Sequence, residues 1–203
     1  PMSQRLVLFI DAQNMYKGAR ETFFGNTGFH TRGQFYPSKL GELIAKKVPI
    51  GHEGEARTLT EVRVYSGRAD SSRDSKTYGA NRRQFAAWEK QGVIVKARTL
   101  KYRYDWPNSE PQEKGVDVAL AVDFVVMAVE GRYDIGVIAS TDTDLLAAIE
   151  YVVTKPDIRV EVAAWHNGAN KELALPNVHL WCHRMLKVDY DFVADYRDYN
   201  IAT

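Results

Sequence analysis

Four aspartates stand where apolar segments of the chain begin or end, and their carboxylates could do chemistry together. They are Asp11, Asp117, Asp142 and Asp144. Carboxylates that gather in one place repel each other and raise one another's pKa values unless a cation neutralises them. A set of oxygen ligands without a cysteine cluster suits Mg²⁺ or Mn²⁺ better than a structural zinc ion. The four residues therefore predict a divalent-metal site that could activate water for hydrolysis.

The elements that must position these acids alternate between strands and helices. Short apolar runs predict strands over residues 5–10, 59–66, 93–97, 134–139, 158–164 and 178–181. Helices are predicted over residues 14–20, 37–47, 116–129 and 145–153, and one more carries Phe85, Ala86 and Trp88 to an end near Gly92. Continuous apolar strands that alternate with helices indicate an α/β fold, with a parallel sheet covered on both faces.

The domain organisation follows from the length of the chain. A chain of 203 residues is enough for one sizeable domain. We predict a single domain over residues 5–203, in which 177–203 form a C-terminal extension packed on the rest. The segment 116–129 is apolar on nearly every side, which predicts a helix buried all round. The acidic end, residues 189–203, is expected to be peripheral.

This topology brings distant acids to one place. In a parallel α/β sheet, each loop that leads from a strand into a helix lies at the carboxyl edge, where ligands usually bind. All four aspartates follow strands at that edge. Asp123 lies six residues after Asp117, and at ~100° per residue the two side chains point about 120° apart. Asp123 is therefore expected to support the site indirectly or to be structural, and Asp134, at the opposite edge, to be structural.

Simpler interpretations exist for single members of this set. Asp142 or Asp144 alone fits the N-cap of a helix. A cap does not require two acids spaced by one residue, nor a third acid at the end of the first strand. For Asn14, a capping role and a functional role fit equally well. The histidines lack the spacing of a known metal motif, so no metal is assigned to them.

Composition places the protein in a reducing setting, while its charge is unevenly distributed. No stretch approaches the roughly 20 apolar residues of a membrane span, and the single cysteine, Cys182, cannot form an internal disulfide. With no recognisable secretory signal, a cytoplasmic location is expected. Residues 63–103 hold 11 Lys or Arg against three Asp or Glu, while the remainder of the chain is net acidic. A basic middle beside an acidic site suits a protein that binds a polyanion.

Three segments together resemble a known family. They are residues 8–14 (LFIDAQN), residues 114–123 (KGVDVALAVD) and residues 133–144, where Tyr133-Asp134 lead to Ser140-Thr-Asp-Thr-Asp144. In this order they resemble the NYN domain, a family that includes LabA-like proteins and belongs to the PIN-like nucleases. The resemblance covers roughly residues 5–164. It implies a three-layer, Rossmann-like fold with a mainly parallel central sheet, and divalent-metal-dependent cleavage of RNA.

The resemblance also implies roles for individual residues. Asp11, Asp117 and Asp142 would be metal ligands, and Asp144 would be a ligand or an acid beside the metal. Asn14 corresponds to the polar residue after the first acid, and Ser140 would orient its loop. Residues 25–58 and those after 176 lie outside the motifs and are candidates for setting partner choice.

RNA is the expected partner, bound through the basic middle of the chain. The predicted contacts are Lys114, Arg82, Arg83, Lys101 and Arg103. Phosphate contacts of this kind make affinity depend on salt. Tyr102, Tyr104 and Trp106 alternate with the charges and could stack on unpaired bases, although the same spacing describes one face of an ordinary strand.

Two other functions remain open from the sequence. The chain could be a non-catalytic RNA-binding or regulatory protein that retains the fold, although retained acids near a phosphate would weaken pure binding. A phosphatase with an aspartyl nucleophile is disfavoured, because Gln13 stands two residues after Asp11, where such enzymes have a second aspartate. No membrane partner is expected, and a homodimer is left open.

Overall fold

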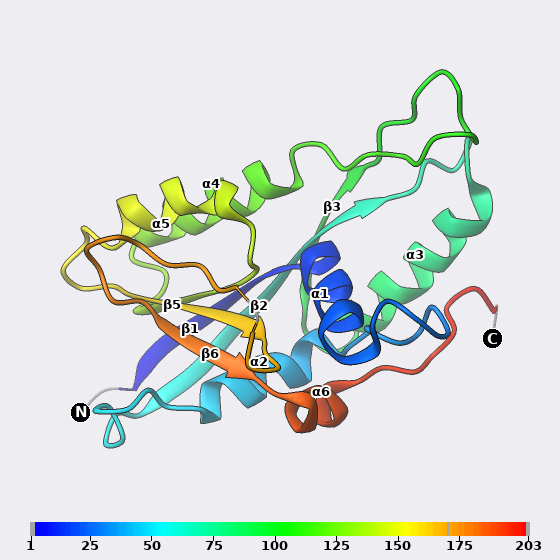
Figure 1. The fold of residues 1–203 in the computed structure, drawn as a ribbon. Helices are drawn as coiled ribbons and strands as arrows, with labels where there is room; N and C mark the ends of the chain where they lie inside the picture. Colours follow the sequence, from blue (N-terminus) through cyan, green and yellow to red (C-terminus); the bar gives the residue numbers. More distant parts are fainter. Residues whose placement is uncertain (1–2, 170, 202–203) are drawn as a thin grey trace.

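A six-stranded sheet forms the centre of the computed structural model, which describes residues 3–169 and 171–201 (Figure 1). The strands are β1 (Gln4–Asp11), β2 (Arg57–Arg68), β3 (Ile94–Thr99), β4 (Ile135–Ala139), β5 (Arg159–Trp165) and β6 (Trp181–Met185). They lie in the order β3-β2-β1-β4-β5-β6, and every neighbouring pair is parallel. The predicted parallel α/β fold is confirmed.

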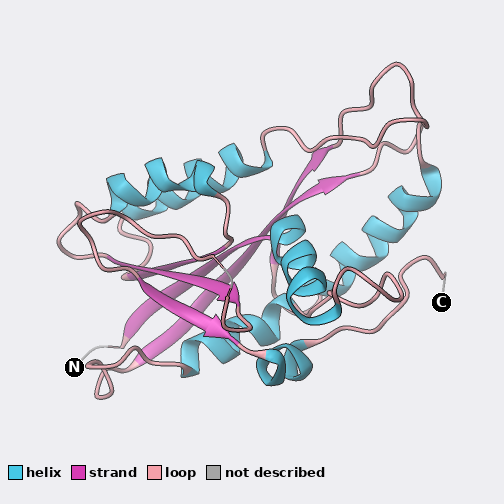
Figure 2. Ribbon diagram, viewed as in Figure 1, coloured by secondary structure: helices cyan, strands magenta, loops and turns pink. Residues whose placement is uncertain are grey.

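Helices cover both faces of the sheet and give the molecule three layers. They are α1 (Ala12–Phe24), α2 (Pro37–Lys46), α3 (Ser75–Glu89), α4 (Val116–Val129), α5 (Leu146–Val152) and α6 (Lys187–Val193). A short 3-10 helix, η1 (Thr143–Leu145), precedes α5, so the helix predicted over 145–153 begins one residue later, at Leu146. Figure 2 shows α4 and α5 on one face, and α1, α2, α3 and α6 on the other.

Strand β1 lies inside the sheet and supplies apolar side chains to both layers. Leu6, Leu8 and Ile10 belong to the core beneath α1, α2 and α3. Val7 and Phe9 alternate with them and belong to the core beneath α4 and α5. Because side chains alternate along a strand, Asp11 continues the row of Val7 and Phe9 and lies on the α4 side. The apolar run of the sequence therefore fixes the face on which the first acid emerges.

The order of the strands defines where a ligand would bind. The chain builds outward from β1 through β2 to β3, then returns to place β4 on the other side of β1. In such sheets a crevice opens at the carboxyl edge between the two strands where the order reverses. Here those strands are β1 and β4, which end at Asp11 and just before Ser140.

Helix α4 has the predicted bounds but is not buried all round. Leu120 and Phe124 are fully buried, whereas Val118, Val122 and Val126 are 64%, 53% and 44% exposed. Composition without periodicity misled the prediction, since a helix packed on one face of a sheet still has an outer side. Within the described ranges, no helix is both long and apolar enough to cross a membrane.

The C-terminal part of the chain differs from its prediction in two ways. The last strand is Trp181–Met185 rather than residues 178–181, and it pairs with β5. The described residues after 186 are not peripheral, because Tyr190 and Val193 are fully buried in the core. The Tyr190 hydroxyl accepts from the Gly33 N–H at 2.7 Å and donates to the Gln34 carbonyl at 3.1 Å. Because aspartates flank Tyr190, the sequence pattern does not predict that these positions are buried.

Candidate functional site

Asp11 sits at the end of β1 and is held on two sides. One carboxylate oxygen, Oδ1, accepts the N–H of Asn14 at 3.0 Å and caps α1. The other, Oδ2, accepts the hydroxyl of Ser140 at 3.2 Å. Asp11, and not Asn14, is therefore the N-cap of the first helix. These two bonds fix the carboxylate at the crevice between β1 and β4.

The loop after β4 is bound to α1 by the side chain of Asn14. The Asn14 Oδ1 accepts both the N–H and the hydroxyl of Thr141, at 3.0 and 3.2 Å. The Ser140 Oγ in turn accepts the N–H of Asp142 at 3.1 Å. Asn14 and Ser140 thus hold the loop in the position that places Asp142 beside Asp11.

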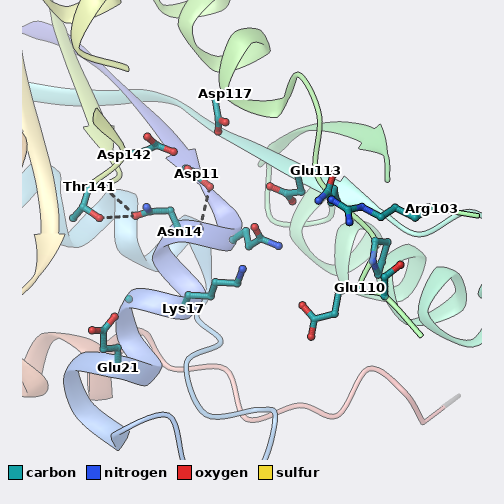
Figure 3. Close-up of a pocket in the computed structure, with 15 residues that line it drawn as sticks. Asp11, Asn14, Lys17, Glu21, Arg103, Glu110, Glu113, Asp117, Thr141 and Asp142 are labelled. Carbon is teal, nitrogen blue, oxygen red and sulfur yellow. Dashed lines mark hydrogen bonds between the residues drawn. The ribbon is translucent and has the colours of Figure 1, made fainter. Parts of the chain in front are cut away.

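Three of the predicted acids converge. Asp117 lies in the first turn of α4, which begins after Gly115 at a positive φ of 75° that favours glycine. Asp11, Asp117 and Asp142 each offer one carboxylate oxygen, and these oxygens all lie within 4.8 Å of one another. Figure 3 shows the three side chains facing a common space from β1, α4 and the loop after β4.

The electrostatics of this cluster disfavour several negative charges. Burial, together with repulsion from Asp117 and Glu113, raises the pKa of Asp11 to about 6. Burial and repulsion from Asp142 and Asp144 raise the pKa of Asp117 as well. In the described part of the chain, no Lys, Arg or His forms a salt bridge with the three clustered acids. Their charge is thus left for a bound cation to neutralise.

Glu113 is a fourth acid at the site that the sequence did not single out. Its Oε1 accepts the N–H of Gly67, at the end of β2, at 2.6 Å. Burial first, and then repulsion from Asp117, raise the pKa of its carboxyl group. In the sequence, Glu113 stands four residues before Asp117, and that spacing is the signal that could have identified it.

The acids line a cavity of about 790 Å³, and two positively charged side chains line it with them. Lys17 reaches it from α1, and Arg103 reaches it from the loop after β3 (Figure 3). Glu21 and Glu110 complete its charged lining. Arg103 was predicted as a phosphate contact, whereas Lys17 was not, because only the direction of α1 shows that it faces the acids.

Asp144 and Asp123 lie outside the converging set. Asp144 is exposed on η1, and its N–H donates to Asp142 Oδ1 at 3.0 Å. Its role as a ligand stays a prediction. Asp123 accepts from Arg63 Nη2 at 3.1 Å and from the Tyr65 hydroxyl at 2.7 Å. It therefore joins α4 to β2, in line with the structural role that its angle on the helix indicated.

The predicted RNA contacts separate into two groups. Lys101 and Lys114 line a groove of about 630 Å³ together with Lys96 and Arg98 of β3, and none of the described residues that line it is acidic. Arg82 and Arg83 lie on α3 and line neither this groove nor the acid cavity. The Arg83 Nε donates to the Tyr199 carbonyl at 2.7 Å, which gives that side chain a structural contact.

The aromatic residues of the loop after β3 have different surroundings. Tyr104 is fully exposed. The Tyr102 hydroxyl accepts the N–H of Asp70 at 3.2 Å, and its ring meets the edge of Trp106 at 4.9 Å between centroids. Of the three, Tyr104 has the freest ring, so base stacking by this loop stays a prediction centred on that residue.

Comparison with protein families covers the segments that carry these acids. The sequence model of the NYN domain matches residues 5–177. The chain belongs to the NYN domain family. NYN domains are PIN-like, a superfamily whose members are generally nucleases, and the LabA-like subfamily is compatible with this match. Strand β6 and helix α6 follow the matched region.

Other comparisons bear on the fold alone. A crystal structure of a protein of unknown function from Vibrio parahaemolyticus has a TM-score of 0.51 and 16% sequence identity to this NYN domain protein. The similarity covers 79% of this chain and 81% of the other. No match is found among proteins with curated functions.

Proposed function

We propose that this NYN domain protein is a divalent-metal-dependent ribonuclease that hydrolyses RNA phosphodiester bonds. The convergence of carboxylate oxygens from Asp11, Asp117 and Asp142 within 4.8 Å carries this proposal. These three carboxylates form no salt bridge with a described Lys, Arg or His, and the pKa values of Asp11 and Asp117 are raised. Such a set of oxygen ligands fits Mg²⁺ or Mn²⁺. Once bound, such an ion would activate water and neutralise charge on the phosphate.

The surrounding residues would hold the site and the substrate. Asn14 and Ser140 keep the loop after β4 in place through their bonds to Thr141, Asp142 and Asp11. Lys17 and Arg103 line the same cavity as the acids, where a phosphate would be bound. Fixed cations at that place attract the anionic substrate, and they stabilise charge that develops during cleavage.

RNA fits the distribution of charge around the site. The groove lined by Lys96, Arg98, Lys101 and Lys114 lies next to the start of α4, which carries Asp117. A strand that left the acid cavity could follow this groove through phosphate contacts, which depend on charge and not on sequence. RNA is preferred to DNA on the strength of family membership.

Cleavage assays with a matched variant test the proposal. Wild type, Asp142→Asn and the control Asp157→Asn, an exposed aspartate away from the cavity, would be incubated with labelled single-stranded RNA or DNA. Each reaction would contain Mn²⁺ or EDTA. We expect cleavage of RNA by wild type and Asp157→Asn with Mn²⁺ only. Asp142→Asn should lose on the order of 100-fold or more, since a bound cation supplies several kcal/mol to the transition state.

Other outcomes would point elsewhere. Binding of RNA without cleavage, in preparations free of contaminating nuclease, would favour a non-catalytic RNA-binding or regulatory protein. A phosphate monoester serves as a third substrate in the same reactions. Release of phosphate from the monoester alone would contradict both the nuclease and the binding protein.

A further inference from the structure

A second cavity opens beside the one that the acids line, and none of Asp11, Asp117 and Asp142 lines it. Its volume is about 370 Å³, which falls within the roughly 300–1,000 Å³ of small-molecule sites. It lies between α1, α3 and the end of β2, on the side of the sheet opposite α4. Gln13 and Glu113 line both this cavity and the acid cavity, so these two side chains stand between them.

The lining combines aromatic rings with amide groups. Tyr16 and Trp88 contribute rings, and Gln13, Asn81 and Gln84 contribute amides. Among the residues that the structure describes, the side chains of Gln13 and Gln84 make no hydrogen bond. The side-chain Oδ1 of Asn81 accepts the N–H of Ala69 at 3.0 Å, which leaves the Asn81 side-chain NH₂ group available to a ligand.

Trp88 adds a hydrogen-bond donor of another kind that has no partner among the described residues. The residue is only 4% exposed, and its indole Nε1 finds no acceptor in residues 3–169 and 171–201. A buried donor without a partner costs free energy, which is recovered when an acceptor arrives. Unpaired amides and an unpaired indole around one cavity indicate a ligand that offers both donors and acceptors on a flat, apolar body.

We propose that this cavity binds the base of an unpaired nucleotide next to the cleaved phosphate. The proposal rests on the proposed nuclease function and names the part of the substrate that gives it base preference. Amide side chains pair with the edges of bases because each carries a donor and an acceptor. Protein recognition of single-stranded RNA commonly combines such bonds with aromatic contacts. Gln13 and Glu113 line both this cavity and the acid cavity, which suits a base attached to a phosphate at the metal site.

Binding of RNA that lacks single bases tests this cavity without requiring cleavage. The full chain with Asp142→Asn would be mixed with fluorescent oligoribonucleotides that carry one abasic residue, moved position by position. We expect one position, or two adjacent ones, to weaken binding by roughly 5- to 100-fold, the range for loss of one recognised base. Adding Gln84→Leu should abolish this dependence on position, so that intact and abasic RNA bind alike.

A matched control makes the same substitution, glutamine to leucine, at a position outside the cavity. Gln91→Leu replaces another glutamine, just after α3, that does not line the cavity. It should leave the abasic penalty unchanged. Gln13→Leu, at an exposed position of α1, is a second test should Gln84→Leu fail to fold, and it should also remove the penalty.

The two proposals can fail separately. Equal binding at every abasic position, or a penalty that survives both Gln84→Leu and Gln13→Leu, would overturn the base cavity even if the wild type cleaves RNA. A penalty that disappears in these variants would support it even if the wild type cleaves nothing. Failure of every oligonucleotide to bind would overturn the base cavity, while the nuclease proposal would stand or fall on cleavage by the wild type.

Discussion

At the scale of single residues, the buried carboxyl group of Asp11 links the site to stability. Burial and its acidic neighbours raise the pKa to about 6 from 3.8. Between these values the folded protein holds a proton that the unfolded chain releases, so stability falls as pH rises from about 4 to 6. Without metal, Asp11→Asn should therefore be more stable than wild type at pH 8, by on the order of 1–3 kcal/mol. Asparagine also caps helices, which preserves the bond to Asn14.

Urea unfolding in EDTA at pH 4, 6 and 8 measures this effect. The gain should become much smaller at pH 4, because the ionised fraction of the carboxyl group in the unfolded chain falls steeply as the pH approaches 3.8. The exposed control Asp157→Asn should show no such trend. A difference between Asp11→Asn and wild type that is the same at all three pH values would contradict the assigned cause.

The acids after β4 should differ in their importance for metal binding. Asp142 belongs to the converging oxygens, whereas Asp144 is exposed and outside that set. In calorimetric titrations with Mn²⁺, Asp142→Asn should weaken affinity on the order of 100-fold or more. Asp144→Asn should stay within about 10-fold of wild type, because an exposed charge contributes on the order of 1 kcal/mol. Equal losses would place Asp144 among the ligands.

Site residues could be predicted from the sequence where they begin or end a regular strand or helix. Asp11 and Asp142 follow apolar strands, and Asp117 opens an apolar helix, so periodicity and topology together place them at one edge. Glu113 lies in an irregular loop, and its position depends on the bond to Gly67 across the sheet. Lys17 needs the direction of α1 to be known. Local residue patterns predict neither the position of Glu113 nor the direction in which Lys17 points.

At the scale of elements, α4 shows what apolar composition hides. Leu120 is fully buried, but Val122, two residues later, is 53% exposed. Leu120→Ala should cost about 2–5 kcal/mol of unfolding free energy because it leaves a cavity in the core. Val122→Ala should stay within about 0.5 kcal/mol, as surface changes usually do. Denaturant melts of both variants decide the matter, and similar losses would mean that the valine face is covered in solution.

Strand β6 and helix α6 illustrate the same limit at the other end of the chain. Their core residues, Met185, Tyr190 and Val193, are separated by charged residues that fit neither a clear strand nor a clear helix pattern. Long-range bonds decide the structure here. The N–H of Tyr36 donates to the Val193 carbonyl at 2.8 Å, joining α6 to the start of α2.

At the scale of the whole molecule, this packing predicts that the matched family region does not fold alone. A chain ending at residue 177 would lack Met185, Tyr190 and Val193, all fully buried. Losing one large core side chain costs about 2–5 kcal/mol, and domains have only about 5–15 kcal/mol of stability. The truncated chain should therefore lose its cooperative thermal transition in circular dichroism. A cooperative melt near that of the full chain would show the C-terminal segment to be dispensable.

The uneven charge of the molecule gives a final prediction about how RNA is held. Lys101 and Lys114 line the groove next to the start of α4, whose lining contains no acid within residues 3–169 and 171–201. Each phosphate contact on a single strand contributes a slope of about −0.7 to the logarithm of affinity against that of salt concentration. Replacing both lysines by glutamine in the Asp142→Asn protein should reduce the magnitude of that slope by about 1.4, with little change in base preference.

A control with two lysines outside the groove distinguishes the loss of local phosphate contacts from the loss of net charge. Lys39→Gln with Lys46→Gln removes the same charge from α2, where neither residue lines the groove or the acid cavity. Fluorescence anisotropy at several salt concentrations should then return a slope close to that of the parent. If the two pairs changed the slope equally, RNA would respond to the total charge of the molecule, and the groove would lose its role as the path of the strand. Charge reversal at Arg82 and Arg83 in the same titration shows whether α3 shares that path.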